Sequence, residues 1–425
     1  MNLIEKDHEF VWHPFTQIKT EASPIHIVKT KGATLIDADG KKYIDCNSSW
    51  WVNIHGHGNK FIGRAISEQF KKIDHIIFAG ATHDKAIELA EKVVNKLPSP
   101  LSKVFFSDDG STAIEVALKM AIQYWHNKSE NRKKILAIDG AYHGDTFGAM
   151  SVGERGVFNI PFEPLFFHVD FLDFPTIEKE KELLNKAQEL LKTNEFAALI
   201  VEPLVQGSAG MRIYRPEFLD ELVRIAKKNK TLVIFDEVMT GWGRTGKWFA
   251  LDHIQEIPDI VCLSKGLTGG VLPLGLTVAT KEIFNAFLSD EKRKAFLHGH
   301  SFTGNPLACA AACASINIME SQKTWESIER ISSRNQHFLQ EIRNHSTVKD
   351  ARCLGTILAI EINVSNESSY FNSMRDEAYH FFLDNGLWIR PLGNVIFVNP
   401  PYCLTHSEQN RIFAILKSFL KKIEI

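Results

Sequence analysis

Short apolar segments alternate with amphipathic segments along the chain from about residue 61 to residue 320. Fully apolar runs of about four to eight residues are typical of strands buried on both faces, and apolar positions spaced three and four apart are typical of helices. We therefore predict an α/β fold with a mainly parallel sheet that helices cover on both faces. The strands are expected at residues 104–106, 135–138, 198–201, 232–235, 260–263 and 276–279.

The two ends of the chain have different patterns. Residues 27–45 alternate around Asp39-Gly40, which is a strong hairpin signal. Near the C-terminus, a charged helix at about 326–345 precedes apolar segments at 355–362 and 388–398, where we predict antiparallel strands, the second around Gly393-Asn394. The expected organisation is an N-terminal segment (1–60) that contributes to a small α+β domain (323–425), beside a large domain (61–322).

Composition restricts the possible partners. The chain has 49 basic and 51 acidic residues and a net charge of −2, so neither nucleic acid nor an acidic membrane is an expected partner. The N-terminal residues do not resemble a signal peptide and no run approaches 18 apolar residues, so we expect a soluble, cytoplasmic protein.

No metal site is expected from the cysteines and histidines. The six cysteines include no CxxC pair, and neither His55-Gly-His57 nor His298-Gly-His300 has the further ligands of a zinc site.

An acid and an amine follow two of the predicted strands. The run 232–235 ends in Asp236, and the run 260–263 is followed by Ser264 and Lys265. Ligands of parallel sheets bind outside the carboxyl ends of the strands, so the two side chains are expected to converge. Separately, Asp236 could cap a turn and Lys265 could be solvated. Together they favour pyridoxal phosphate, whose aldehyde a lysine holds as a Schiff base and whose ring nitrogen an acid keeps protonated.

The phosphate of such a cofactor needs a helix N-terminus, and residues 108–112 supply one after the strand at 104–106. Gly110 allows an anion to approach the backbone, and Thr112-x-x-Glu115 matches a capping box. An ordinary strand-to-helix turn explains this segment equally well. The GxGxxG match at 241–246 lacks the helix and the later acidic residue of a dinucleotide site, so we reject that interpretation.

Several motifs together resemble a known family. The motifs are Phe235-Asp236-Glu237-Val238, Gly243-Arg244-Thr245-Gly246 and Leu263-Ser264-Lys265-Gly266. Through them, residues 10–400 resemble the class III, fold-type I aminotransferases. The resemblance implies a large domain with a mainly parallel, seven-stranded sheet that binds pyridoxal phosphate. Four segments most resemble the biotin-pathway branch of that family, which makes 7,8-diaminononanoate from 8-amino-7-oxononanoate by a ping-pong reaction. These are residues 12–17, 47–56, 141–150 and 298–308, and Trp50-Trp51 is the most specific element.

The resemblance implies roles for matching residues. Lys265, Asp236 and Tyr142 would be catalytic, with Tyr142 and Val238 on opposite faces of the cofactor ring. Gly110 and Ser111 would hold the phosphate, and Ser301 would reach it from the second subunit of a homodimer. A further set of residues would bind the substrate: Trp50, Trp51, Tyr142, Gly299, Arg390 and Phe15. Arg390 would bind its carboxylate, and Trp50, Trp51 and Tyr142 would cover its aliphatic chain.

The amino donor stays open on the sequence. Trp50-Trp51 favours S-adenosylmethionine, because an aromatic wall suits a sulfonium cation. Relatives that use this donor have Tyr where this chain has Phe15, and Pro-Thr where it has His300-Ser301; both segments resemble the branch that uses lysine. A broad ω-aminotransferase and a non-catalytic cofactor-binding protein are the remaining alternatives. Trp50-Trp51 with Arg390 argues against the former, and Lys265 with Asp236 against the latter.

Overall fold

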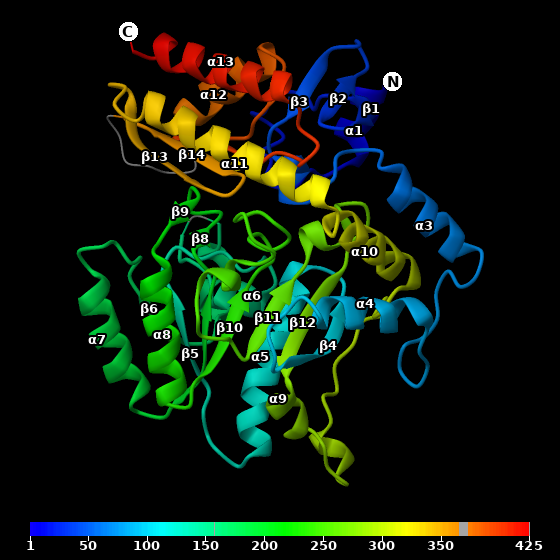
Figure 1. The fold of residues 1–425 in the computed structure, drawn as a ribbon, viewed down its shortest axis with the longest axis vertical. Coiled ribbons are helices and arrows are strands. Elements are labelled where there is room, and N and C mark those ends of the chain that lie inside the picture. Colours follow the sequence, from blue (N-terminus) through cyan, green and yellow to red (C-terminus); the bar gives the residue numbers. More distant parts are fainter. Residues whose placement is uncertain (157, 365–372, 425) are drawn as a thin grey trace.

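A seven-stranded sheet forms the centre of the larger part of the molecule (Figure 1). The computed structural model describes residues 1–156, 158–364 and 373–424. The strand order is β4-β12-β11-β10-β7-β5-β6; β12 runs antiparallel to both of its neighbours, and the other neighbours pair in parallel. The strands are β4 (Leu101–Ser107), β5 (Lys134–Ile138), β6 (Val169–Leu172), β7 (Phe196–Val201), β10 (Leu232–Asp236), β11 (Ile260–Leu263) and β12 (Gly275–Thr280).

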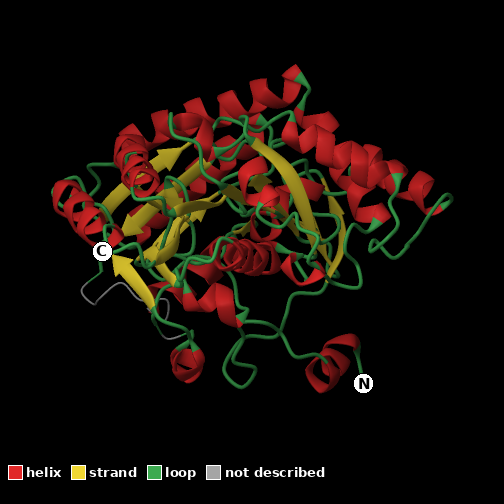
Figure 2. Ribbon diagram, turned by 90° about the horizontal axis from the view of Figure 1, so that it is seen from below, coloured by secondary structure: helices red, strands yellow, loops and turns green. Residues whose placement is uncertain are grey.

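Burial of every residue explains why β7 and β11 are wholly apolar. Along β10, Val233 and Phe235 belong to one hydrophobic core, whereas Leu232 and Ile234 belong to the core on the opposite face of the sheet. Helices therefore cover both faces, as Figure 2 shows from below. The predicted α/β class and all six predicted strands are confirmed, while β6 was not predicted.

Helices of different length surround the sheet. Helix α5 packs along one face, and α4, α7 and α8 contribute to the core on the other face. The helices of this part are α3 (Lys60–Phe70), α4 (Asp84–Val94), α5 (Gly110–Asn127), α6 (Phe147–Ser151), α7 (Glu180–Leu191), α8 (Pro216–Lys228), α9 (Lys281–Asn285) and α10 (Pro306–Met319). Short elements join them: η1 (Ile160–Leu165), η2 (Ala250–His253), η3 (Lys265–Thr268), η4 (Lys292–Lys294) and the pair β8 (Val205–Gln206) and β9 (Arg212–Ile213).

The N-terminal hairpin lies beside the C-terminal elements (Figure 1). As predicted, β2 (Thr34–Asp37) and β3 (Lys42–Asp45) are antiparallel around Asp39-Gly40, and β1 (Ile27–Lys31) extends their sheet. The fourth strand of this sheet is β15 (Leu387–Trp388), which pairs in parallel with β3. The N-terminal segment also contains α1 (Leu3–Phe10) and α2 (Ser48–Trp51). The domain limits near residues 60 and 322 stay a prediction.

The C-terminal strands differ from the prediction in one respect. Strands β13 (Val348–Leu354), β14 (Ile357–Ile362) and β16 (Val395–Val398) form an antiparallel sheet. The segment 388–398 is not one strand, because β15 joins the N-terminal sheet and only β16 pairs with β14. Helices α11 (Gln322–Ile342), α12 (Ser373–Asp384) and α13 (His406–Lys422) complete this part. Across the described residues, no helix has the length and apolar character needed to span a membrane.

Candidate active site

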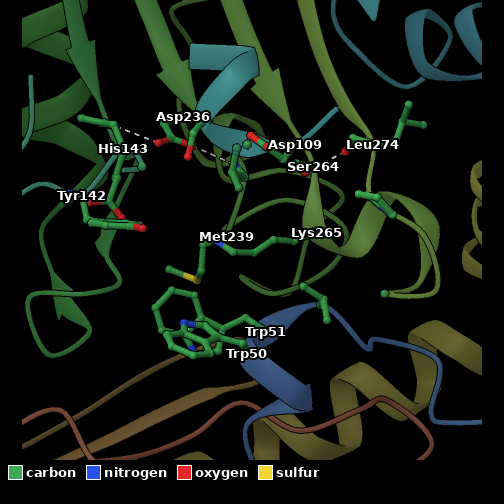
Figure 3. Close-up of a pocket in the computed structure, with 18 of the residues that line it drawn as sticks. Trp50, Trp51, Asp109, Tyr142, His143, Asp236, Met239, Ser264, Lys265 and Leu274 are labelled. Carbon is green, nitrogen blue, oxygen red and sulfur yellow. Dashed lines mark hydrogen bonds and ion pairs between the residues drawn. The ribbon is translucent and has the colours of Figure 1, made fainter. Parts of the chain in front are cut away.

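A cavity of about 380 Å³ lies where several parallel strands end. Asp236 is the last residue of β10, Lys265 follows β11 by two residues, and Gly110 and Ser111 follow β4. Figure 3 shows Trp50 and Trp51 on the side of the cavity opposite Asp236. Eight of the residues predicted from the sequence line this cavity: Trp50, Trp51, Gly110, Ser111, Tyr142, Asp236, Val238 and Lys265.

The Asp236 carboxylate is buried and held in place from two directions. Its Oδ2 lies 2.7 Å from Nδ1 of His143, and its Oδ1 accepts a hydrogen bond of 3.0 Å from the Val238 amide. His143 was not predicted, although it directly follows Tyr142. Its Nε2 is buried and has no partner among the described residues. The contact between His143 Nδ1 and Asp236 Oδ2 orients the Asp236 carboxylate towards the cavity.

The Lys265 backbone has a left-handed conformation, with φ of 44°. This conformation is unfavourable for a residue with a side chain, and such backbone strain is concentrated at functional sites. The Nζ atom lies 5.0 Å from the centroid of the Trp51 ring. Burial lowers the pKa of Lys265, while the charges of Asp236 and Glu202 oppose the shift. A lowered pKa makes the free amine available for reaction with a carbonyl group.

The helix behind the proposed phosphate site begins differently from the prediction. Thr112 is not the N-cap: the Asp109 carboxylate accepts a 2.8 Å hydrogen bond from the Thr112 amide, so Asp109 caps a helix that begins at Gly110. The Glu115 carboxylate instead accepts hydrogen bonds from the Gly148 and Ala149 amides. In the described part of the chain, the Gly110 and Ser111 amides at the N-terminus of α5 therefore have no partner within the helix. They are available as hydrogen-bond donors to a ligand.

Glu202 is a second residue that sequence reasoning missed. It directly follows β7, and its carboxylate accepts hydrogen bonds of 2.9 Å from the Tyr142 and Gly207 amides. Burial raises the pKa of Glu202 to about 7. The Tyr142 hydroxyl donates to Asp145 Oδ2 at 2.9 Å, so both ends of this residue are fixed beside the cavity. Glu202 could have been identified from the sequence, because it directly follows a predicted strand, as Asp236 does.

Four of the predicted site residues are not among those that line the cavity. Phe15 and Arg390 lie at its edge against Trp50: the Phe15 and Trp50 ring centroids are 5.4 Å apart, and the Arg390 guanidinium is 5.3 Å from the Trp50 ring. Gly299 and Ser301 are exposed. A role for Ser301 in the site of a second subunit stays a prediction.

The two HxH pairs have other contacts. His55 Nε2 lies 2.9 Å from the Ser315 hydroxyl, and burial lowers the pKa of His55 to about 3. His298 lies between Lys119 and His300. Over residues 1–156, 158–364 and 373–424, no group of three or more His, Cys, Asp or Glu side chains could hold a metal ion.

The cavity fits a ligand that carries an aldehyde, a cationic ring nitrogen and a phosphate. Lys265 supplies an amine, Asp236 a buried carboxylate and α5 two free amides. The backbone at the phosphate end is tightly packed: a Cβ atom on Gly110 would lie 2.8 Å from Cγ1 of Val238, and one on Gly144 would lie 2.1 Å from the Ser111 hydroxyl. Glycine at these two positions preserves the close approach of backbone amides that an anion requires.

Comparisons with known proteins agree with this chemistry. The family model described as aminotransferase class-III matches residues 16–420. The chain is 47% identical to an adenosylmethionine-8-amino-7-oxononanoate aminotransferase of Synechococcus elongatus, over 98% of this chain and 99% of the relative. It is 38% identical to the crystal structure of an enzyme with the same name from Methanocaldococcus jannaschii, with a TM-score of 0.94 and coverage of 99% and 98%. An amine transaminase from an uncultivated Pseudomonas species, crystallised with PLP bound, is 28% identical, with a TM-score of 0.90 and coverage of 97% and 98%.

Proposed function

The chain belongs to the class III aminotransferases and is a pyridoxal-phosphate enzyme, and from this premise we propose that it transfers an amino group to 8-amino-7-oxononanoate in biotin biosynthesis. The product is 7,8-diaminononanoate. The observation that carries the proposal is the position of Arg390 beside Trp50, at the edge of the cavity that contains Lys265 and Asp236. A long acceptor that has a ketone near one end and a carboxylate at the other matches this arrangement.

Different residues of the cavity would bind different parts of the cofactor. When bound, pyridoxal phosphate supplies a ring that withdraws electrons from the carbon attached to the transferred nitrogen. Asp236 holds a proton on the ring nitrogen, and His143 keeps its carboxylate oriented. The amides of Gly110 and Ser111 would bind the phosphate, and Tyr142 and Val238 would lie on the two faces of the ring. Lys265 Nζ would hold the cofactor through its aldehyde and, once the substrate amine has displaced it there, the free Lys265 amine would move a proton at the substrate carbon.

The acceptor is recognised at its carboxylate end and along its aliphatic chain. A guanidinium binds a carboxylate through two parallel hydrogen bonds, so Arg390 fixes the end that does not react. Trp50 and Trp51 cover the aliphatic chain and exclude water from it. The second substrate, the amino donor, is S-adenosylmethionine in this proposal, since the aromatic wall suits a sulfonium and the similar relatives are named for this donor. Lysine is the second candidate donor, favoured by Phe15 and His300-Ser301.

We further propose a homodimer in the cytoplasm, with shared active sites. Large apolar side chains are exposed on this chain: Trp12 is 89% exposed, Leu297 80% and Phe302 60%. A second copy would cover such side chains, since extensive exposed apolar surface marks an interaction site. Ser301 lies beside Phe302 in the same segment and would reach the phosphate of the partner.

A coupled assay tests the proposal. Purified protein is incubated with 8-amino-7-oxononanoate and one donor from a panel of S-adenosylmethionine, lysine, ornithine and alanine, and 7,8-diaminononanoate is measured by mass spectrometry. We expect product with S-adenosylmethionine. Product with lysine alone would preserve the acceptor and change the donor. Product only with alanine or ornithine, or turnover of simple amines without this acceptor, would identify a broad ω-aminotransferase instead.

Arg390 offers a sharper test of the acceptor. Arg390→Gln removes the charge, and we expect the KM for 8-amino-7-oxononanoate to rise by about 10- to 100-fold, because hydrogen bonds between charged groups contribute about 1.5–3 kcal/mol. The KM for the donor should change much less. Arg390→Lys keeps the charge without the planar fork and should give an intermediate value. Arg411→Gln, at an arginine that bonds the Asn385 carbonyl, is the control. Equal effects on both substrates would contradict the assignment.

A further inference from the structure

The two tryptophans are presented by a turn with an unusual backbone. Ser48, Ser49, Trp50 and Trp51 have φ values of 49°, 45°, 70° and 70°, so four successive residues that carry side chains form a left-handed turn. Chains of L-residues disfavour this conformation, and glycine is the residue that adopts it without cost. The residue types within the turn therefore do not explain why it forms. Contacts from outside the turn must hold it.

A buried carboxylate directly behind the turn provides the first set of contacts. Asp45 ends β3 and its side chain is fully buried. Its Oδ1 accepts hydrogen bonds from the Asn47 amide at 3.3 Å and the Ser49 amide at 3.0 Å, and its Oδ2 accepts the Ser49 hydroxyl at 2.8 Å. One side chain thus satisfies the backbone on the inner side of the turn.

His57 completes the support of this carboxylate. Its Nε2 lies 2.8 Å from Asp45 Oδ2, and its Nδ1 lies 2.9 Å from the side-chain amide of Asn53. With the Asn53 amide donating to Nδ1, the ring carries its proton on Nε2 and donates it to Asp45. Neither Asp45 nor His57 lines the cavity. Their contacts lead to the turn and not to the reacting atoms.

The opposite side of the turn is fixed by the C-terminal part of the chain and by Arg244. The Asn47 side-chain amide donates to the Phe397 carbonyl at 2.9 Å, and the Ser48 hydroxyl donates to the Asn399 carbonyl at 2.8 Å. The buried Arg244 guanidinium donates to the Trp51 carbonyl at 3.1 Å. The turn is therefore held between two sets of contacts, of which the Asp45–His57 pair is the one inside the N-terminal segment.

We propose that Asp45, supported by His57, is a positioning residue that keeps the turn 48–51 left-handed and thereby sets how Trp50 and Trp51 meet the substrate. The inference rests on the proposed function in one respect, namely that the acceptor lies against these tryptophans. Asp45 acts through the backbone amides of the turn and touches neither substrate nor cofactor. It determines acceptor affinity and leaves the chemistry at Lys265 intact.

The holoenzyme of Asp45→Asn tests the proposal. An asparagine keeps the size but loses the charge and one acceptor, so we expect the KM for 8-amino-7-oxononanoate to rise about tenfold, the effect of weakening one hydrogen bond to a charged group. The kcat and the absorbance of the bound cofactor should stay within about twofold of the wild type. The double variant Asp45→Asn/Ser49→Gly should recover most of the lost affinity, because glycine adopts a positive φ freely. A general loss of stability would instead lower the fraction of active enzyme, and so the apparent kcat, without raising the KM.

Controls separate this inference from the assignment of the substrate. Asp170→Asn, which removes an aspartate–histidine contact on the edge strand β6, should leave the KM unchanged. Hydrogen–deuterium exchange over residues 46–54 should be faster in Asp45→Asn and slower again in the double variant, whatever the acceptor is. If Asp45→Asn does not fold, His57→Ala carries the same expectations. An unchanged KM and unchanged exchange in folded variants, or a raised KM that Ser49→Gly does not restore, overturns the proposal; absence of turnover in the wild type overturns only the proposed function.

Discussion

Lys265→Ala is expected to lower turnover by about 10⁴-fold or more, since it removes both the amine that holds the cofactor and the base that moves the substrate proton. The cofactor should nevertheless remain bound. The Gly110 and Ser111 amides at the N-terminus of α5, the Asp236 carboxylate and the Tyr142 ring all stay in place in this variant. Turnover and cofactor binding are therefore expected to separate.

Two measurements check this separation. Steady-state assays give the loss of turnover, and the ratio of cofactor absorbance to protein absorbance gives the occupancy after gel filtration. After borohydride reduction, mass spectrometry should find the cofactor covalently attached to the wild type and not to Lys265→Ala. Lys192→Ala, at an exposed lysine on the surface, should behave as the wild type in all three respects. A Lys265→Ala protein that contains no cofactor would show that the phosphate site at Gly110 and Ser111 binds too weakly to act alone.

The catalytic pair could be predicted because local sequence determines where a buried strand ends. Asp236 and Lys265 follow apolar runs, and parallel strands bring their carboxyl ends to one edge of a sheet. The local sequence also marks Glu202, which directly follows the predicted strand at 198–201, but it does not show which residues Glu202 and His143 contact. The contact of His143 with Asp236 spans 93 residues and that of Glu202 with Tyr142 spans 60, so both depend on the packing of distant segments.

Two local features also escaped prediction for physical reasons. Asp109 and Thr112 are both good capping residues, and the pattern Thr112-x-x-Glu115 favoured Thr112 as the N-cap. In the structure the helix begins at Gly110, and Asp109 caps it. The left-handed turn at 48–51 contains no glycine, so propensity argues against it. Contacts from Asp45, Arg244 and the C-terminal part of the chain override that propensity; Asp45 is close in sequence, whereas the other contacts span 193 to 351 residues.

Asp236→Asn is expected to reduce turnover by about 10³-fold, because removing one charge from a buried ion pair costs about 3–5 kcal/mol. The substitution keeps the shape of the side chain, so the Val238 amide retains its acceptor. What is lost is the negative charge that holds a proton on the cofactor ring nitrogen. Single-turnover kinetics with the donor alone should show the loss, since this half of the reaction does not involve the acceptor or Arg390.

His143 provides the matched comparison for Asp236. His143→Leu leaves the carboxylate charged but removes its 2.7 Å partner, so we expect a smaller loss of about 10- to 100-fold, the effect of one hydrogen bond to a charged group. The double variant should lose no more than Asp236→Asn alone, because His143 acts through the carboxylate that is already neutralised. Additive losses would mean that His143 has a contact of its own with the substrate or cofactor through Nε2, the buried atom that has no partner among the described residues. The turnover rates of the two single variants and the double variant therefore show whether His143 only orients Asp236 or also contacts the substrate or cofactor.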